Sequence, residues 1–289
     1  MDATTRTPAR PAAVSGAPDG QRALAALGAG FLESLTSHDP GKARLAPSFR
    51  ATENLREVPV GAGLWETAED FLGLLTFIDP AQSQLVHLGV AVAGGHRPFA
   101  LRVKAEGGLL TEAETILGSD VKGHFADVDQ LLKPDIIYGA PVPPDRASDR
   151  DGLLRVADSY WRGLQESDGS LVPVGYRCDR YDNGKKITNT LTTLLSPDAA
   201  VHTVASCLNA TRGARPRVRG RRFPVLDVAH GVAVSLAVAD FHPVPSSPRP
   251  DSGSFYVVAV FKVVDQEIRI IDEIREIMPL GTPCAWSGE

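Results

Sequence analysis

Two stretches of the sequence resemble each other: residues 31–54, FLESLTSHDPGKARLAPSFRATEN, and residues 160–183, YWRGLQESDGSLVPVGYRCDRYDN. Four pairs of identical or chemically similar residues share one offset of 129 positions without a gap: Leu35 with Leu164, Asp39 with Asp168, Glu53 with Asp182, and Asn54 with Asn183. The units of solenoid proteins are much shorter than this period. The similarity therefore predicts two copies of one domain.

Each copy is expected to begin with a helix. The apolar positions with helical spacing are Leu24, Leu27, Phe31 and Leu35 in the first copy, and Leu154, Ala157, Trp161 and Leu164 in the second. A short polar strand follows, and Asn183-Gly184 is typical of a hairpin turn. The sequence also indicates a second helix in each copy, over residues 64–77 and 191–208.

Extended runs close each copy, and those of the second copy are rich in β-branched residues. They cover residues 84–93, 98–105 and 109–117 in the first copy, and 218–226, 231–240, 256–264 and 268–278 in the second. The order of helix, strand, helix and a run of antiparallel strands predicts the α+β class.

The chain is expected to divide into five parts. Residues 133–150 are rich in Pro and Asp, which break helices and sheets, and form the predicted linker. We expect domains over residues 22–132 and 151–278 that pack face to face. Residues 1–21 form a predicted disordered leader, and residues 279–289 a C-terminal tail.

Composition narrows the function classes. The 289 residues carry a formal net charge of −5 and are 43% hydrophobic, and this mild acidity disfavours nucleic-acid and membrane-surface partners. The three cysteines form no CxxC pair, which disfavours a disulfide framework and a zinc knuckle. No signal peptide or membrane-spanning run is recognisable. We expect a cytoplasmic protein, and a homo-oligomer is compatible with these features.

Residues 49–67 and 177–189 (RCDRYDNGKKITN) resemble the first hairpin, and the turn into the second helix, of the SnoaL-like (nuclear-transport-factor-like) family. The resemblance implies two tandem cone-shaped domains, each a curved, mostly antiparallel sheet wrapped round helices that enclose a pocket. The family includes ketosteroid isomerases, polyketide cyclases, dehydratases, epoxide hydrolases, cofactor-free lyases and binding proteins. Fold alone does not choose among these activities.

The resemblance suggests Tyr160 and Asp182 as a catalytic pair. In the isomerases of this family, a tyrosine on the first helix donates to an oxyanion and a carboxylate on the following hairpin moves a proton. The alternative is that Tyr160 belongs to the core and that Asp182 only caps a turn. The first copy has Phe31 in place of the tyrosine and keeps the carboxylate as Glu53, so we favour the second copy slightly.

Histidines are further candidates because their pKa lies near neutral pH. His87 with Glu53 would supply the first copy with a base and an orienting acid, and His202 is expected on the second helix of the second copy. A histidine with a satisfied structural partner is the alternative for each. No HxH or HxxxH pair occurs, so we predict no metal.

Charged residues on strands form a third set. In the run 99–105, Arg102 and Lys104 alternate with apolar residues, and we favour a surface location over a role in binding an oxyanion. Lys262 holds the place of Lys104 in the second copy. Trp161 and Tyr181, like Arg102, His202 and Lys262, are candidates for substrate binding. The arginine-rich stretch 212–222 is most consistent with a solvated or interface face.

No dinucleotide fingerprint, P-loop or nucleophile elbow occurs, so we predict no cofactor. The leading hypothesis is a cofactor-independent lyase that dehydrates or cleaves a small apolar hydroxylated compound, aromatic and of lignin-derived type, as in formaldehyde release. The alternatives are an isomerase or cyclase of a polyketide or terpenoid, and a non-catalytic binding protein.

Overall fold

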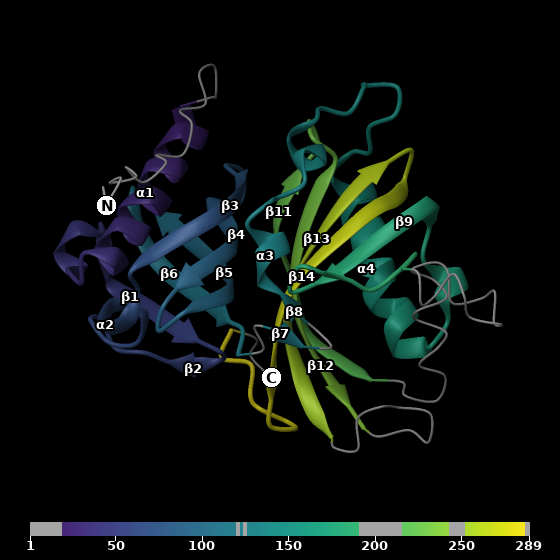
Figure 1. Ribbon diagram of the computed structural model, residues 1–289. Coiled ribbons are helices and arrows are strands. Elements are labelled where there is room, and N and C mark those ends of the chain that lie inside the picture. Colours follow the sequence, from purple (N-terminus) through teal and green to yellow (C-terminus); the bar gives the residue numbers. More distant parts are fainter. Residues whose placement is uncertain (1–18, 120–121, 124–125, 191–215, 243–251, 287–289) are drawn as a thin grey trace, which may run out of the picture.

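The computed structural model describes residues 19–119, 122–123, 126–190, 216–242 and 252–286 (Figure 1). The predicted helix over residues 191–208, with His202, lies outside the described residues. So does most of the predicted leader, although its last residues belong to the first helix. Among the described helices, none is long and apolar enough to cross a bilayer.

The first half of the chain forms one sheet and its helices. Its elements are α1 (Asp19–Thr36), η1 (Pro40–Lys42), β1 (Leu45–Glu53), β2 (Arg56–Glu57), α2 (Leu64–Thr67), β3 (Asp70–Asp79), β4 (Gln84–Val92), β5 (His96–Glu106) and β6 (Leu109–Leu117). The connecting segment contains β7 (Lys122–Gly123), β8 (Ala126–Asp127), α3 (Val128–Leu131) and η2 (Ile136–Gly139).

The second half follows the same plan. Its described elements are α4 (Arg150–Glu166), η3 (Gly169–Leu171), β9 (Val174–Asp182), β10 (Lys185–Lys186), β11 (Arg217–Asp227), β12 (Val232–Phe241), β13 (Gly253–Val264) and β14 (Glu267–Met278). The predicted extended runs are therefore strands, and Asn183-Gly184 forms the β9–β10 turn.

Both sheets are mixed and have six strands in equivalent order. The first runs β2-β1-β6-β5-β4-β3 and the second β10-β9-β14-β13-β12-β11. In each sheet one pair of neighbouring strands is parallel, β1 with β6 in the first and β9 with β14 in the second. The other pairs are antiparallel. The predicted α+β class is confirmed in this form: two mixed sheets with few helices.

Matched residues in the two halves have matched conformations. Asp39 accepts a hydrogen bond from the N–H of Gly41 and caps η1, and Asp168 accepts one from the N–H of Ser170 and caps η3. Gly73 in β3 and Gly220 in β11 both have positive φ, 61° and 60°, at irregularities of the strand pairing. The shared capping role explains why Asp39 and Asp168 match in the sequence repeat.

The predicted helix over residues 64–77 is wrong. Helix α2 ends at Thr67, and β3 begins at Asp70 and pairs with β4 along its length. The apolar residues from Phe71 to Phe77 fit a helical period and a two-sided strand equally well, and Gly73 introduces a positive φ that a helix excludes. Pairing with β4 decides the outcome.

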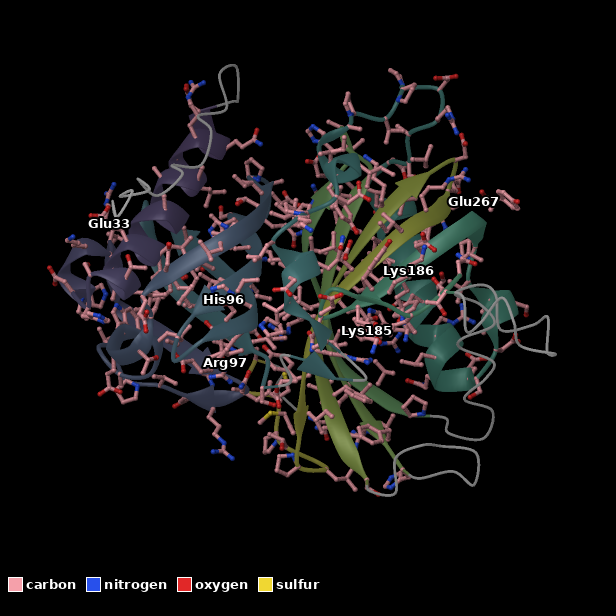
Figure 2. All side chains as sticks on the ribbon, viewed as in Figure 1. Glu33, His96, Arg97, Lys185, Lys186 and Glu267 are labelled. Carbon is pink, nitrogen blue, oxygen red and sulfur yellow. The ribbon has the colours of Figure 1, made fainter. Side chains whose placement is uncertain are left out.

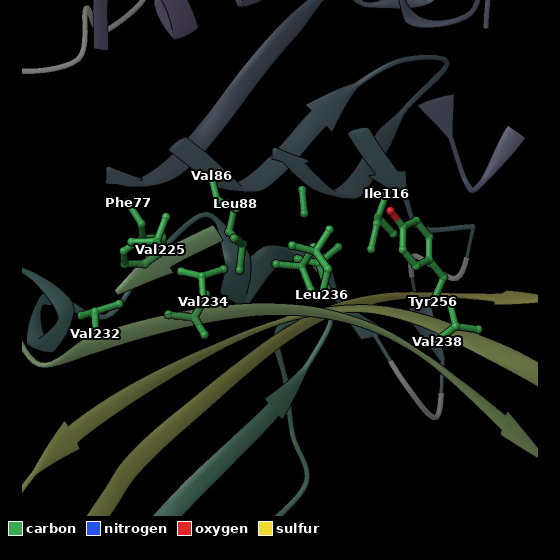
Figure 3. Close-up of a cluster of buried hydrophobic side chains, with 14 of the residues drawn as sticks. Phe77, Val86, Leu88, Ile116, Val225, Val232, Val234, Leu236, Val238 and Tyr256 are labelled. Atoms are coloured by element: carbon green, nitrogen blue, oxygen red, sulfur yellow. The ribbon is translucent and has the colours of Figure 1, made fainter. Parts of the chain in front are cut away.

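The two sheets pack against each other through the faces that the long helices leave free (Figures 1 and 3). Side chains on β3, β4 and β6, such as Phe77, Val86, Leu88 and Ile116, face side chains on β11 and β12, such as Val225, Val234 and Leu236 (Figure 3). Side chains from both sheets fill the space between them (Figure 2). Helix α1 covers the opposite face of the first sheet, and α4 that of the second.

Each half sends a segment across to the other. In the predicted linker, the hydroxyl of Tyr138 donates to Asp272 Oδ2 of β14 at 2.6 Å. In the tail, Trp286 Nε1 donates to Thr52 Oγ1 of β1 at 2.9 Å, and the Arg50 guanidinium lies 4.6 Å from the Trp286 ring centroid. The linker and the described part of the tail are therefore packed parts of the interface.

Candidate active site

A cluster of five polar residues lies in the second half, on the face of the sheet that α4 covers. Because side chains alternate between the two faces of a strand, Arg180 and Asp182 of β9 share this face with Glu273 and Arg275 of β14. Asp182 and Glu273 are direct partners in the parallel ladder. Tyr160 contacts them from α4, the helix that covers this face. We call these five residues the Tyr160 cluster.

Hydrogen bonds and ion pairs connect the cluster. The Tyr160 hydroxyl donates to Glu273 Oε1 at 2.6 Å and accepts from Arg180 Nη1 at 3.2 Å. Asp182 lies between two guanidinium groups, with Oδ2 at 2.6 Å from Arg275 Nη2 and Oδ1 at 3.1 Å from Arg180 Nε. Arg275 Nη1 also lies 3.9 Å from Glu273 Oε2. Arg180 thus connects the phenol to Asp182, and Arg275 connects the two carboxyl groups.

The cluster is largely removed from solvent. The side chain of Asp182 is fully buried and those of Glu273, Arg275 and Arg180 are 4%, 11% and 13% exposed. Burial raises the pKa of Glu273, with a further contribution from the negative charge of Asp182. Burial also raises the pKa of Tyr160 well above its usual value. Tyr160 is therefore a neutral donor, and Glu273 holds a proton at higher pH than an exposed glutamate does.

Apolar and aromatic side chains surround the phenol. The ring of Tyr160 packs edge-on against Trp161 and Phe261, with centroid distances of 5.1 and 5.3 Å. Trp161 is buried, and its Nε1 donates to Ser235 Oγ at 3.0 Å. The guanidinium of Arg275 lies 4.8 Å from the centroid of Phe255. Such a low-dielectric setting strengthens the electrostatic interactions of the charged groups.

Comparisons with known proteins give limited matches. Residues 146–275, which include the whole Tyr160 cluster, match the family model described as "Domain of unknown function (DUF8021)". No curated protein matches the chain significantly. A similar solved structure is titled "Structure of an M.tuberculosis LEH-like epoxide hydrolase". It has a TM-score of 0.34 and 16% sequence identity, and the similarity covers 44% of this chain and 85% of that chain.

The first half does not repeat the cluster. The position of Tyr160 is occupied by Phe31, whose ring packs edge-on against Trp65 at 5.2 Å. In the β1–β6 ladder Glu53 pairs with Thr115, whereas in the second half the equivalent residue, Asp182, pairs with Glu273. Glu53 Oε1 accepts a hydrogen bond from the Leu64 N–H at 2.7 Å, and burial raises the pKa of Glu53. Glu53 thus stabilises the start of α2.

His87 lies on the α1-covered face of the first sheet. Its Nδ1 is 2.9 Å from Thr76 Oγ1, and its buried Nε2 has no hydrogen-bond partner. Burial lowers the pKa of His87 to about 4, so the ring is neutral at pH 7. A Cβ added to Gly28 of α1 would lie 3.0 Å from His87 Nε2, so the helix packs closely on the ring. No hydrogen bond joins His87 to Glu53 among the described residues.

Four other predicted site residues lie on the faces of the two sheets that α1 and α4 do not cover. Arg102 and Lys104 alternate with the apolar residues that face α1, and they pair with acidic residues of β6. Lys104 is partly exposed, whereas Arg102 is buried where the two sheets pack together, so a surface location does not describe Arg102. Lys262 Nζ donates to the carbonyl oxygens of Ala140 and His230. Tyr181 lies between Arg180 and Asp182 in sequence and therefore points away from Tyr160.

Sequence reasoning missed Arg180, Glu273 and Arg275. The signal was present in β14, where Ile271, Glu273 and Arg275 alternate, but charged residues in a strand usually indicate a solvated face. Only the parallel pairing of β9 with β14, two strands separated by about 90 residues, brings these groups to Asp182. Among the described residues, no group of three or more His, Cys, Asp or Glu could hold a metal ion.

Proposed function

We propose that the chain is a cofactor-independent acid–base enzyme, a lyase that acts on a small apolar hydroxylated compound, with the Tyr160 cluster as its active site. In this proposal both halves are SnoaL-like cones, and only the second is catalytic. The observation that carries it is the 2.6 Å hydrogen bond from Tyr160 to Glu273 inside a buried cluster that also contains an arginine-flanked carboxylate.

The two carboxyl groups have environments suited to different roles. Burial favours the protonated form of Glu273, so this group is the proton donor to a leaving hydroxyl. Asp182 forms ion pairs with two guanidinium groups, which hold its carboxylate in place. Its negative charge can stabilise a cation that develops as the hydroxyl departs, and Asp182 can then accept a proton. Pairs of carboxyl groups with such separated roles recur in acid–base enzymes.

A dehydration step balances with these groups alone. Glu273 transfers its proton to the substrate hydroxyl, the C–O bond breaks, and water leaves. Asp182 removes a proton from the neighbouring carbon, and the electron pair of that C–H bond forms the C=C bond. If the neighbouring carbon carries a hydroxymethyl group, removal of its O–H proton breaks the C–C bond and releases formaldehyde instead. Tyr160 and Arg180 hold Glu273 and Asp182 in place through the contacts described above.

A substrate panel with product analysis tests the proposal. Aryl-substituted diols, benzylic alcohols and hydroxylated terpenoids are incubated with the wild-type protein and with Glu273→Gln, and mass spectrometry and a formaldehyde assay follow the products. We expect loss of water or of formaldehyde from an aryl-substituted member, and a decrease of at least about 10²-fold in Glu273→Gln.

Other outcomes contradict the proposal. A product of unchanged mass supports an isomerase or cyclase, and addition of water to an epoxide supports a hydrolase. Binding of a panel member without turnover supports a binding protein. Equal rates for the wild type and for a Glu273→Gln variant with an unchanged circular-dichroism melting curve exclude the Tyr160 cluster as the active site.

A further inference from the structure

Two carboxylates, the buried Glu114 and the half-buried Asp272, occupy equivalent positions in the two sheets, on the faces that pack together. Glu114 of β6 pairs with Arg102 of β5, and Asp272 of β14 pairs with Val260 of β13 in the same place of the ladder. In both halves a tyrosine hydroxyl reaches the carboxylate. Tyr256 donates to Glu114, and Tyr138 donates to Asp272. The equivalence allows the surroundings of the two groups to be compared directly.

Glu114 is neutralised by arginines. Arg222 of β11 binds both its oxygens, with Nη1 and Nη2 each 2.7 Å from a carboxylate oxygen. Arg102 Nη1 lies 3.4 Å from Oε2. The side chain of Glu114 is fully buried, and two cations compensate its charge there. Such a bidentate pair is the strong form of a buried ion pair.

Asp272 lacks these cations. The residue equivalent to Arg222 is Leu75 of β3, because Leu75 pairs with Leu88 as Arg222 pairs with Leu236. The residue equivalent to Arg102 is Val260. Within the part of the chain that the structure describes, no Lys or Arg forms an ion pair with Asp272, and the largest charge effects on its pKa come from the acidic residues Asp135, Glu273 and Asp182. Burial is the largest cause that raises the pKa of Asp272, to about 6.

A cavity lies between Leu75 and Asp272, the residues equivalent to Arg222 and Glu114. It has a volume of about 100 Å³, and Leu75, Leu88, Ile270, Ile274, Tyr181 and Asp272 contribute to its walls. About 10–15 Å³ on this scale admits one water molecule, so the cavity holds several non-hydrogen atoms. Lys133 and Asp135 line it from the connecting segment. The walls thus combine aliphatic side chains, a phenol, a lysine and carboxyl groups, and Asp272 forms no ion pair with that lysine among the described residues.

We propose that this cavity binds a small organic cation, an ammonium or guanidinium head on a short apolar body, whose head takes the place at Asp272 that Arg222 takes at Glu114. The apolar body lies against Leu75, Leu88 and Ile274. A carboxylate with a missing cation and an apolar hollow beside it favours a cation over a neutral molecule of the same shape. Asp272 and Ile274 point away from the Tyr160 cluster because side chains alternate along β14, although Glu273 between them also lines the cavity. The proposal does not depend on the proposed enzymatic function.

Isothermal titration of the full chain at pH 7.5 and low salt tests the site. The probe is n-propylammonium chloride, and 1-propanol is its neutral counterpart. For a ligand of this size we expect a dissociation constant of the order of millimolar, at least tenfold tighter than that of 1-propanol. Asp272→Asn should abolish the preference for the cation, whereas Tyr160→Phe should leave it unchanged.

A second variant supplies the missing cation within the chain. In Leu75→Arg the guanidinium should fill the cavity and pair with Asp272, which blocks the probe and raises the melting temperature. If Leu75→Arg does not fold, Asp272→Asn decides the question alone. Equal binding of the cation and the alcohol, no binding of the cation at tens of millimolar, or unchanged cation binding in Asp272→Asn overturns the proposal.

Discussion

Asn54 and Asn183 make the same pair of hydrogen bonds in the two halves of the chain. Asn183 Nδ2 donates to the Arg275 carbonyl at 3.0 Å, and its Oδ1 accepts from the Arg275 N–H at 2.8 Å. Asn54 does the same with Leu117, at 3.0 and 2.9 Å. Both asparagines have φ of 47°, a conformation that asparagine tolerates better than most residues. The amide continues the parallel ladder where the main chain has to turn.

This relationship predicts the effects of two substitutions. Asn183→Gly keeps the freedom to adopt positive φ but leaves the partly buried N–H and carbonyl of Arg275 without these partners, so we expect a loss of about 1 kcal/mol or more of unfolding free energy. Asn183→Ala should lose more, because alanine also resists positive φ. Urea unfolding measures both, and Asn54→Gly is the matched variant in the first half. Unchanged stability in Asn183→Gly contradicts the structural role.

Substitutions of the proposed proton-accepting Asp182 and of Tyr160, which positions Glu273, should show which half of the chain is active. Tyr160→Phe and Asp182→Asn should each lower turnover at least about 10²-fold on whichever compound the wild type converts. Glu53→Gln and His87→Gln should keep near-wild-type turnover, because Glu53 caps α2 and His87 bonds Thr76. Steady-state rates of the four variants are compared alongside their melting curves. The reverse pattern would place the activity in the first half.

His87 predicts a loss of stability in acid. Its pKa is lowered to about 4 in the folded protein, from 6.5 as the ordinary value. Between these values the unfolded chain binds more protons than the folded one, so stability decreases as the pH falls through this window. At pH 5 the expected cost relative to pH 7 is about 2 kcal/mol. Urea unfolding at both pH values should show a smaller decrease in His87→Gln, and equal decreases would contradict the prediction.

Asp272 predicts a pH dependence of stability opposite to that of His87. Its pKa is raised from 3.8 to about 6, so the folded chain binds more protons between these values, and the residue costs stability as the pH rises through them. The cost at pH 8 is roughly 3 kcal/mol. Without added ligand, Asp272→Asn should therefore unfold at higher urea than the wild type at pH 8, and the difference should shrink towards pH 4. A variant that is less stable at pH 8 would show that the carboxylate is neutralised.

Arg222 should contribute strongly to the packing of the two sheets. Arg222→Leu leaves Glu114 buried with the weaker Arg102 contact, and we expect a loss of about 3–5 kcal/mol. The double variant Arg222→Leu with Glu114→Leu should recover much of it, because no uncompensated charge remains. Arg221→Leu is the control, since Arg221 forms a partly exposed pair with Asp158, for which about 1 kcal/mol or less is typical.

Local sequence signals predicted much of the fold. The spacing of Leu27 and Phe31 indicated α1, and Asn183-Gly184 indicated its hairpin. Long-range pairing decided the rest. The apolar positions of residues 70–77 fit both the helical and the strand period, so a helix was predicted. These residues form a strand because they pair with β4. In the candidate site, Tyr160 and Asp182 were predicted, whereas Glu273 and Arg275 depend on the pairing of β14 with β9, which no local pattern encodes.

Joining the two sheets in one polypeptide has a consequence for divergence. In a symmetric pair of identical subunits, any substitution occurs on both sides of the interface at once. Here the two members of each equivalent pair are encoded separately, so one position carries Arg222 and the other Leu75, and one carries Phe31 and the other Tyr160. Each half can therefore change its interior without imposing the same change on the other.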